Sequence, residues 1–301
     1  MKKGINMGDH LELKKHSDRE FVYPIKDWYF DVLAGLDFDH IRLPARWSDH
    51  CDDSFKIQDY FMQAVKKAVD DFLARGYKVV LNVHHFNGAT QDPKAYQDQL
   101  FCLWRQIGEA FADYPDTLIF EVMNEPQHMV SAADWNDVQN KAVEVIRETN
   151  KTRKIMIGGV NWNGYDGLLQ VEPPKDHNLI ATFHYYHPMS FTHQGARWSP
   201  ENTDLKGIKW MGTEDEVKAI KQHFQLVYDW SKAKGIEVNL GEFGAYQTGD
   251  MESRVRWTKC VRETAEEFGF SFTYWEFNYG FGICEREAPV LRKPLVDALL
   301  G

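Results

Sequence analysis

KVVLNVHH at residues 78–85 and TLIFEVMNE at residues 117–125 are two apolar runs that each end in polar side chains. An amphipathic stretch over residues 97–113 lies between them. A short apolar run, a longer amphipathic stretch and a second apolar run are typical of a β-strand, an α-helix and a parallel β-strand. The two runs therefore predict one βαβ unit.

The same pattern recurs along the whole chain. Apolar runs lie at residues 4–8, 40–44, 78–85, 117–125, 154–162, 178–186, 237–243 and 271–277. Amphipathic helices are expected over residues 57–75, 97–113, 132–151, 215–234 and 252–268. Eight βα units predict an α/β protein in which residues 1–301 form a single (β/α)8 TIM barrel. A doubly wound open sheet is the alternative, but its common GxGxxG and GxxxxGK[ST] motifs are missing.

Composition and charge limit which binding partners and which cellular compartment are expected for the protein. The 35 basic and 45 acidic side chains give a net charge of −10, which disfavours nucleic acid as a partner. No apolar run approaches the roughly 18 residues of a membrane span, and none follows the basic N-terminus as in a secretory signal. We therefore expect either a cytoplasmic protein or one whose signal has been removed. The chain has four widely spaced cysteines, Cys51, Cys102, Cys260 and Cys284. Their spacing favours free thiols over a disulfide framework or a metal site. No linker or second binding module is visible, and we expect a monomer.

Polar side chains gather at the C-terminal ends of the apolar runs, although parallel strands buried on both faces are usually apolar throughout. These residues are Arg42, His84, His85, Asn124, Glu125, His184, Tyr186, Glu242, Trp275 and Glu276. Any one of them alone is explained as a structural histidine or a stabilising ion pair. In a barrel all these ends meet on one face, which carries the active site. Together they predict a catalytic face.

Glu125 and Glu242 end the fourth and seventh runs and form a candidate catalytic pair. Hydrolysis of a glycosidic bond needs one carboxylic acid to protonate the departing oxygen and one carboxylate to attack or to activate water. Arg42 would favour the ionised form of one glutamate, and an aromatic setting would raise the pKa of the other. This chemistry needs no cofactor. A metal site built from the histidines and a glutamate is the alternative, but HExxH and similar ligand spacings are absent, so we expect no metal.

The strand-end motifs resemble those of glycoside hydrolase family 5, in the same order and over nearly the whole chain. They are Arg42-Leu43-Pro44, Asn82-Val83-His84-His85, Asn124-Glu125-Pro126, His184-Tyr185-Tyr186, Gly241-Glu242-Phe243-Gly244 and Tyr274-Trp275-Glu276-Phe277. FTHQGARW at 191–198 and MESRVRW at 251–257 are similar to the branch with bacterial endo-β-glucanases, some of which also cleave mannans.

The resemblance implies roles for these residues. Glu125 would be the general acid/base and Glu242 the nucleophile of a retaining endo-β-1,4-glucanase, a cellulase that cleaves cellulose or β-glucan chains by double displacement. Arg42 and Tyr186 would orient Glu242, and Asn124 would bind the sugar 2-hydroxyl. The substrate-binding set would be completed by Glu12, His84, His85, His184 and Trp275.

Three alternatives to this function stay open. A β-mannanase or glucomannanase and a mixed-linkage β-glucanase would use the same chemistry. A non-catalytic carbohydrate-binding barrel would be expected to lose one glutamate, and both are present. One departure from relatives concerns sugar contacts, because Asp9 stands where they commonly have Asn, and an ionised carboxylate accepts but cannot donate a hydrogen bond.

Several tryptophans are candidate sugar-stacking platforms. Trp162, Trp198 and Trp210 follow the fifth and sixth runs, and the last two belong to the long segment 188–212, which we expect to form a wall of the cleft. The tryptophans within helical patterns are expected to pack the helices against the barrel, and they are Trp104, Trp135, Trp230 and Trp257.

Overall fold

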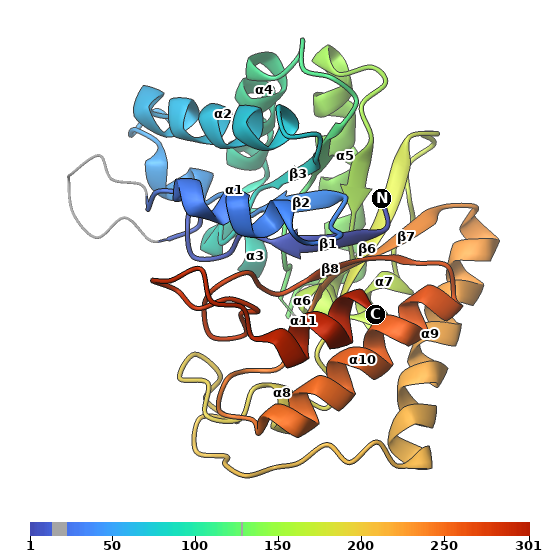
Figure 1. Ribbon diagram of the computed structural model, residues 1–301. Helices are drawn as coiled ribbons and strands as arrows, with labels where there is room; N and C mark the ends of the chain where they lie inside the picture. The colour runs from blue at the N-terminus through green and yellow to red at the C-terminus, as the bar shows by residue number, and fades with distance from the viewer. Residues whose placement is uncertain (14–22, 128) are drawn as a thin grey trace.

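A computed structural model describes residues 1–13, 23–127 and 129–301 of the protein. In these residues, eight parallel strands close into a barrel in sequence order (Figure 1). The strands are β1 (Lys3–Asn6), β2 (His40–Leu43), β3 (Lys78–Asn82), β4 (Leu118–Glu121), β5 (Ile155–Ile157), β6 (Leu179–Tyr185), β7 (Glu237–Phe243) and β8 (Ser271–Tyr274). The predicted (β/α)8 barrel is confirmed, and the open doubly wound sheet is wrong.

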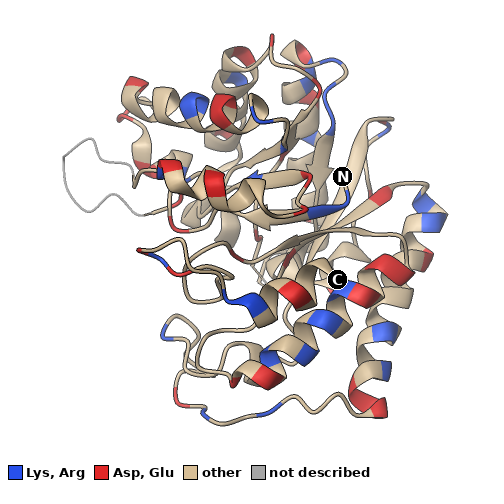
Figure 2. Ribbon diagram, viewed as in Figure 1, with Lys and Arg blue, Asp and Glu red and all other residues tan. Residues whose placement is uncertain are grey.

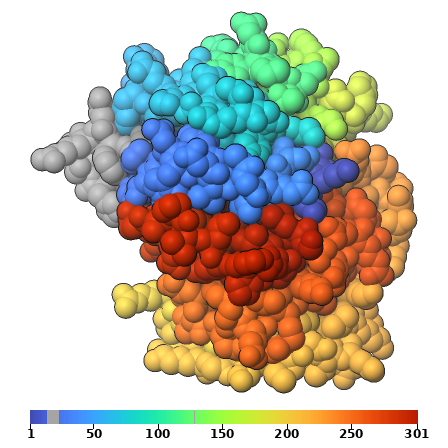
Figure 3. Space-filling model, viewed as in Figure 1, coloured from blue at the N-terminus to red at the C-terminus, as the bar shows by residue number. Residues whose placement is uncertain are grey.

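Helices follow the strands and cover the outside of the barrel (Figures 1 and 3). They are α1 (Asp27–Ala34), the 3₁₀ helix η1 (Trp47–His50), α2 (Asp59–Leu73), α3 (Asn87–Gln91), α4 (Gln97–Ala110), α5 (Ala132–Thr149), α6 (Val160–Asn163), α7 (Tyr165–Leu168), α8 (Met189–Thr192), α9 (Glu214–Lys234), α10 (Met251–Glu267) and α11 (Lys293–Leu300). The five long helices expected from the sequence are confirmed as α2, α4, α5, α9 and α10. Helices α1 and α11 were not expected.

The helix layer packs against the barrel through buried aromatic side chains, as expected. Trp104, Trp135 and Trp257 are fully buried, and Trp230 is nearly so. Their burial costs little in hydrogen bonding where the indole N–H reaches a backbone carbonyl. Those of Trp104, Trp135 and Trp257 donate to the carbonyl oxygens of Val122, Gly158 and His187. Charged residues of both signs are distributed along the outer helices (Figure 2).

The barrel interior is apolar on one side and polar on the other. Val80, Ile119, Met156 and Ile180 of β3 to β6 form a buried apolar cluster. On the opposite side a hydrogen-bonded chain runs across β2, β8 and β7. It comprises the pairs His40 Nε2 with Thr273 Oγ1 (2.9 Å), Thr273 Oγ1 with Asn239 Oδ1 (3.2 Å) and Asn239 Nδ2 with Ser271 Oγ (2.9 Å). The sequence predicts polar side chains at the strand ends. The structure shows that polar side chains also lie inside the barrel.

Strands β3 and β4 end earlier than the apolar runs predicted. Consequently His84, Asn124 and Glu125 lie in the first turns of the following loops. These loops still bond to their neighbours, because the His84 N–H donates to Ala45 O (2.8 Å) and the Asn124 N–H donates to Val83 O (3.0 Å). Backbone hydrogen bonds therefore fix the position of these residues beyond the ends of the regular strands.

Two further expectations concern cysteines and membranes. All four cysteines are free thiols, as predicted. Within the described part of the chain, no helix has the length and apolar character needed to cross a bilayer.

Candidate active site

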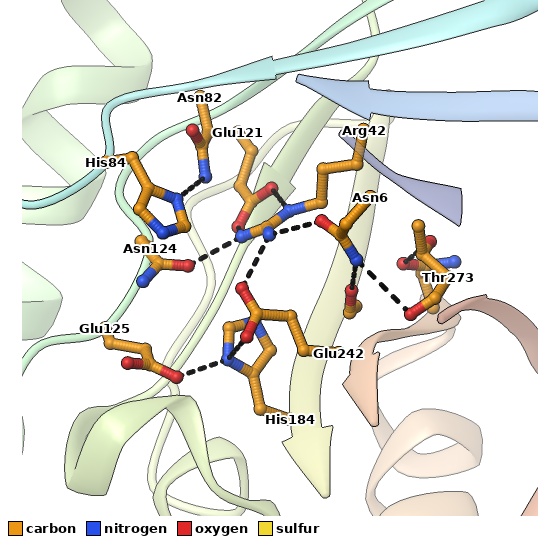
Figure 4. A network of polar contacts seen from close by, with 12 residues as sticks. Asn6, Arg42, Asn82, His84, Glu121, Asn124, Glu125, His184, Glu242 and Thr273 are labelled. Carbon is orange, nitrogen blue, oxygen red and sulfur yellow. Dashed lines mark hydrogen bonds and ion pairs between the residues drawn. The ribbon is translucent and has the colours of Figure 1, made fainter. Parts of the chain in front are cut away.

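The Arg42 guanidinium lies at the centre of a buried polar network at the C-terminal end of the barrel (Figure 4). Its five N–H groups all have acceptors, in the fork geometry that suits carboxylates. The bonds are Nε to Glu121 Oε2 (2.6 Å), Nη2 to Glu121 Oε1 (2.8 Å) and Asn124 Oδ1 (2.7 Å), and Nη1 to Asn6 Oδ1 (2.8 Å) and Glu242 Oε1 (2.7 Å). Strands β1, β2, β4 and β7 are thereby tied together through one side chain.

Glu125 and Glu242 approach each other across His184. His184 Nδ1 lies 2.7 Å from Glu125 Oε1 and 3.6 Å from Glu242 Oε2. One oxygen of each carboxyl group and a His184 nitrogen all lie within 4.8 Å of one another. The Tyr186 hydroxyl donates to Glu242 Oε2 (2.9 Å). The two predicted catalytic glutamates therefore share one small volume, as the strand-end argument expected.

The two glutamates have different surroundings. Burial raises the pKa of Glu125 to about 7, and the Glu121 carboxylate adds to this rise while Arg42 opposes it. Burial also raises the pKa of Glu242 above its ordinary value, against the opposing charges of His184 and Arg42. Glu125 makes no direct contact with the guanidinium, whereas Glu242 is ion-paired with it. Glu125 is thus suited to hold a proton near neutral pH, and Glu242 to carry the negative charge.

Glu12, His84 and Trp275 form the adjoining wall. The His84 ring lies parallel to the Trp275 indole, with centroids 5.8 Å apart and an interplanar angle of 6°. Glu12 is buried, and its Oε2 lies 4.0 Å from His84 Nε2. His85 is exposed, next to His84, and adopts a left-handed backbone conformation with φ of 49°. All four residues that the sequence assigned to substrate binding here lie near one another.

The candidate aromatic platforms do not behave alike. Trp198 is 55% exposed and packs edge-on against Tyr246, with ring centroids 4.9 Å apart. Trp162 is also exposed. Trp210, in contrast, is 2% exposed, so the prediction that it forms a stacking platform is wrong. Its ring packs into the apolar core, and its carbonyl accepts two bonds from Arg256.

Sequence reasoning missed three residues of the network. Glu121 binds Arg42 through two bonds, and Asn6 binds it through a third. Asn82 Nδ2 donates to His84 Nδ1 (3.0 Å). The signal was present for all three, because each is a polar side chain within an otherwise apolar run, and each is the last residue of its strand.

The chain matches known proteins over most of its length. A family model described as cellulase (glycosyl hydrolase family 5) matches residues 11–280. Endoglucanase H of Acetivibrio thermocellus is 31% identical over 292 residues, which cover 96% of this chain and 31% of that protein. The chain thus spans about a third of the length of that relative.

Solved structures agree with this match. A hyperthermophilic endo-β-1,4-glucanase, solved in complex with substrate, superposes with a TM-score of 0.94 at 42% identity, covering 100% of this chain and 96% of the other. Thermotoga maritima Cel5A, solved in complexes with mannotriose and with cellobiose, superposes with a TM-score of 0.93 at 38% identity, covering 99% of this chain and 97% of the other. The barrel, the paired glutamates and these matches lead to one conclusion: the chain belongs to glycosyl hydrolase family 5.

Proposed function

We propose that the protein is a retaining endo-β-1,4-glucanase in which Glu125 is the acid/base and Glu242 the nucleophile. The observation that carries the proposal is the approach of the two carboxyl groups to within 4.8 Å, oxygen to oxygen, beside His184. Retaining glycosidases hold their carboxyl groups about 5–5.5 Å apart, whereas inverting enzymes leave about 6.5–9.5 Å for a water molecule. The short separation supports double displacement.

In the first step, a Glu242 oxygen attacks the anomeric carbon and forms a glycosyl ester. The bond from that carbon to the leaving oxygen breaks with its electron pair, and the Glu125 carboxyl proton passes to the leaving oxygen. In the second step, Glu125 takes a proton from water, whose oxygen attacks the same carbon and releases Glu242 as a carboxylate. The raised pKa of Glu125, about 7, supports the acid role of this residue.

Arg42 and Tyr186 hold the nucleophile in a fixed orientation by bonds to different oxygens of Glu242. Asn124 is also held, because its Oδ1 accepts from Arg42. Its Nδ2 is then the atom left to donate to a sugar hydroxyl, which supports the role that the family resemblance gave it. The Trp275 indole beside His84 offers a flat apolar surface of the kind that pyranose rings stack on.

The assignment is tested with Glu125→Ala and Glu242→Ala variants and azide. Each variant should lose several orders of magnitude in kcat. Azide should rescue Glu242→Ala by attack at the vacated face and give an α-glycosyl azide, and it should rescue Glu125→Ala after ester formation and give a β-glycosyl azide. Glu237→Gln, an exposed glutamate at the opposite end of β7, is the control and should keep normal activity. Near-normal kcat in either alanine variant, or exchanged anomers, would refute the roles.

A β-1,4-glucan is the first choice of substrate because the matched relatives are named as glucanases. Glucomannan is the second candidate, since Thermotoga maritima Cel5A was solved with both cellobiose and mannotriose. Initial rates on carboxymethyl-cellulose, mixed-linkage glucan, glucomannan and galactomannan distinguish these substrates. A viscosity loss that outpaces reducing-end release on carboxymethyl-cellulose would support the endo mode, and parallel changes would contradict it.

A further inference from the structure

Glu12, His84 and His85 form a second cluster of potential metal ligands beside the catalytic pair. One ligand atom from each lies within 4.8 Å of the other two. Glu12 Oε2 is 4.0 Å from His84 Nε2, and the two imidazole rings are 4.4 Å apart at an angle of 88°. Ligand atoms around a tetrahedral zinc ion are about 3.3–3.5 Å apart, since each bond is about 2.0–2.2 Å long. A small rotation of the exposed His85 and of Glu12 would close the set around an ion.

The Glu12 carboxylate is an incompletely satisfied group aimed at this cluster. Its Oε1 accepts from the Asp9 N–H (3.1 Å), but its Oε2 is buried and has no hydrogen-bond partner among the described residues. A buried carboxylate oxygen without a donor is costly, and a cation is one group that relieves that cost. The carboxyl groups of Asp9, Glu276 and Glu242 lie close enough to act electrostatically on Glu12.

Among residues 1–13, 23–127 and 129–301, the arginines that act electrostatically on His84 do not fill this role. Arg42 already donates its N–H groups to acceptors of the network around it, and Arg46 Nε is paired with Asp49 (2.9 Å). The other cluster that brings together a histidine and carboxylates, Glu125 with His184 and Glu242, is less favourable for a cation. There the Arg42 Nη1 group lies 2.7 Å from Glu242 and already supplies the positive charge.

We propose that Glu12, His84 and His85 bind a borderline divalent transition-metal ion, of the class of Zn²⁺, Co²⁺ or Cu²⁺, which inhibits the enzyme reversibly. Two imidazoles and one carboxylate favour this class over Mg²⁺ and Ca²⁺, which prefer all-oxygen sites. An ion held there lies against the His84 and Trp275 wall of the cleft and excludes a sugar from it. The hydrolytic chemistry itself needs no metal, so the ion is an inhibitor and not a cofactor.

Asn82 sets the strength of this site through the tautomer of His84. Its Nδ2 donates to His84 Nδ1 (3.0 Å), and its Oδ1 accepts a long bond from the Ala45 N–H (3.3 Å). This arrangement places the ring proton on Nε2, where the ion would bind. Metal binding therefore requires the Asn82 amide to turn and to accept the proton moved to Nδ1, at the loss of the Ala45 bond. An aspartate at position 82 accepts from both groups at once and completes a carboxylate–histidine–metal arrangement.

The test is a calorimetric titration of the intact protein with ZnCl₂ in a non-chelating buffer, together with Co²⁺ absorption spectra. We expect one ion per chain, at least about tenfold weaker binding in Glu12→Gln and in His85→Ala, and tighter binding in Asn82→Asp. His177→Ala, which removes an exposed histidine just before β6, and Glu237→Gln are the matched controls and should bind as the unchanged protein does. Zn²⁺ should raise the apparent KM less in His85→Ala than in the unchanged protein.

Three results would overturn the proposal. One is the absence of Zn²⁺ binding at millimolar concentration. Another is unaltered binding in His85→Ala combined with loss of binding in Glu125→Gln, which would assign the ion to the catalytic pair. The third is weaker binding in an Asn82→Asp protein whose circular dichroism is unchanged. Because His85 is exposed, its variant should fold, and the gain expected from Asn82→Asp cannot arise from unfolding.

Discussion

Arg42 acts electrostatically on both proposed catalytic carboxyl groups, but it contacts only that of Glu242. Its ion pair with Glu242 favours the ionised form of that proposed nucleophile, while Glu121 opposes its effect on the pKa of Glu125. Separation of the two pKa values is the requirement for one glutamate to act as acid and the other as nucleophile. In this site the Arg42 guanidinium opposes the rise that burial causes in both pKa values, but it forms an ion pair only with Glu242.

The first residue-scale prediction concerns the alkaline side of the pH profile. In the proposed mechanism Glu125 holds a proton in the first step, and burial raises its pKa to about 7, so kcat/KM should fall as the pH rises through 7. The profile is measured on a soluble aryl cello-oligosaccharide whose leaving group needs protonation. With a strongly activated aryl leaving group, which departs without a proton, the fall should disappear from the glycosylation step. A fall that persists with both substrates would show that another group causes it.

The second prediction is that Glu121→Gln moves the alkaline fall of kcat/KM to lower pH. The Glu121 carboxylate raises the pKa of Glu125, so its removal leaves the charge of Arg42 to lower that pKa. Stability should drop by about 3 kcal/mol, the lower end for a broken buried pair, because Glu242 still pairs with the guanidinium. Glu237→Gln is the control. If Glu121→Gln loses stability but its pH profile does not move, then Glu121 has only a structural role and does not set the pKa of Glu125.

The sequence identified most of the residues at the strand ends because side-chain chemistry there departs sharply from the apolar pattern. Glu121 and Asn6 escaped because the apolar runs continue past them, although each is the last residue of its strand in the structure. Trp210 was wrongly assigned since a tryptophan in a long polar segment has the same appearance whether its ring faces the cleft or the core. Contacts between distant segments decide such cases.

At the scale of elements, a register shift between β6 and β7 brings His184 opposite Glu242. Phe183 pairs with Leu240, but His184 pairs with Glu242, so Gly241 is passed over. The extra residue bends the strand and re-aims the next side chain. A Cβ on Gly241 would lie 2.5 Å from Thr182 Oγ1 and 3.3 Å from the His184 ring, so the position needs a glycine.

Gly241→Ala should therefore lower kcat by more than its loss of folding stability can explain. The methyl group displaces His184 from the two glutamates, while overpacking costs about 1–3 kcal/mol of unfolding free energy. Kinetics and thermal unfolding at the same pH measure both quantities. Gly35→Ala is the matched control, because only the Val32 carbonyl oxygen lies near a Cβ there, at 3.5 Å, and both quantities should stay close to normal. Unchanged kcat in Gly241→Ala would remove the role given to the register shift.

The elements themselves were predictable where periodicity is long. Helix α9 also has a capping box at Thr213 and Glu216, and Gly235, with φ of 68°, caps its C-terminal end. Helices α1 and α11 escaped because eight residues hold barely two turns of pattern, although the proline at the start of α11 was a signal. The register shift at Gly241 leaves no trace in hydrophobic periodicity, so only pairing across strands reveals it.

At the scale of the whole molecule, one side of the barrel interior is apolar and the other is polar. The apolar cluster of β3 to β6 gives the interior a conventional core, whereas the polar chain through β7, β8 and β2 continues into Asn6 and Arg42. Asn6 Nδ2 donates to Gly241 O (3.0 Å), which links this polar side to the strand that carries Glu242. The candidate active site is thus the C-terminal end of a polar layer that begins deep in the barrel.

Helix α11 fastens the end of the chain to its beginning. Lys3 Nζ of β1 donates to Leu300 O (2.8 Å), and Arg262 Nε of α10 donates to Ala298 O (3.1 Å). Leu299 is fully buried in the core that extends through the strands and the outer helices. Because this core is continuous, a cavity at α11 should weaken the barrel as a whole.

Leu299→Ala should therefore lower the unfolding free energy by about 2–5 kcal/mol, the range for a leucine removed from a packed core. Near-ultraviolet circular dichroism and residual activity should be lost together on heating, at a reduced Tm, while kcat at 25 °C stays near normal because α11 contributes no residue to the Arg42 network. Leu226→Ala, an exposed leucine on α9, is the matched control and should leave Tm almost unchanged. If α11 instead melts in a separate earlier transition and activity survives it, then the helix is an independent appendage and does not close the barrel.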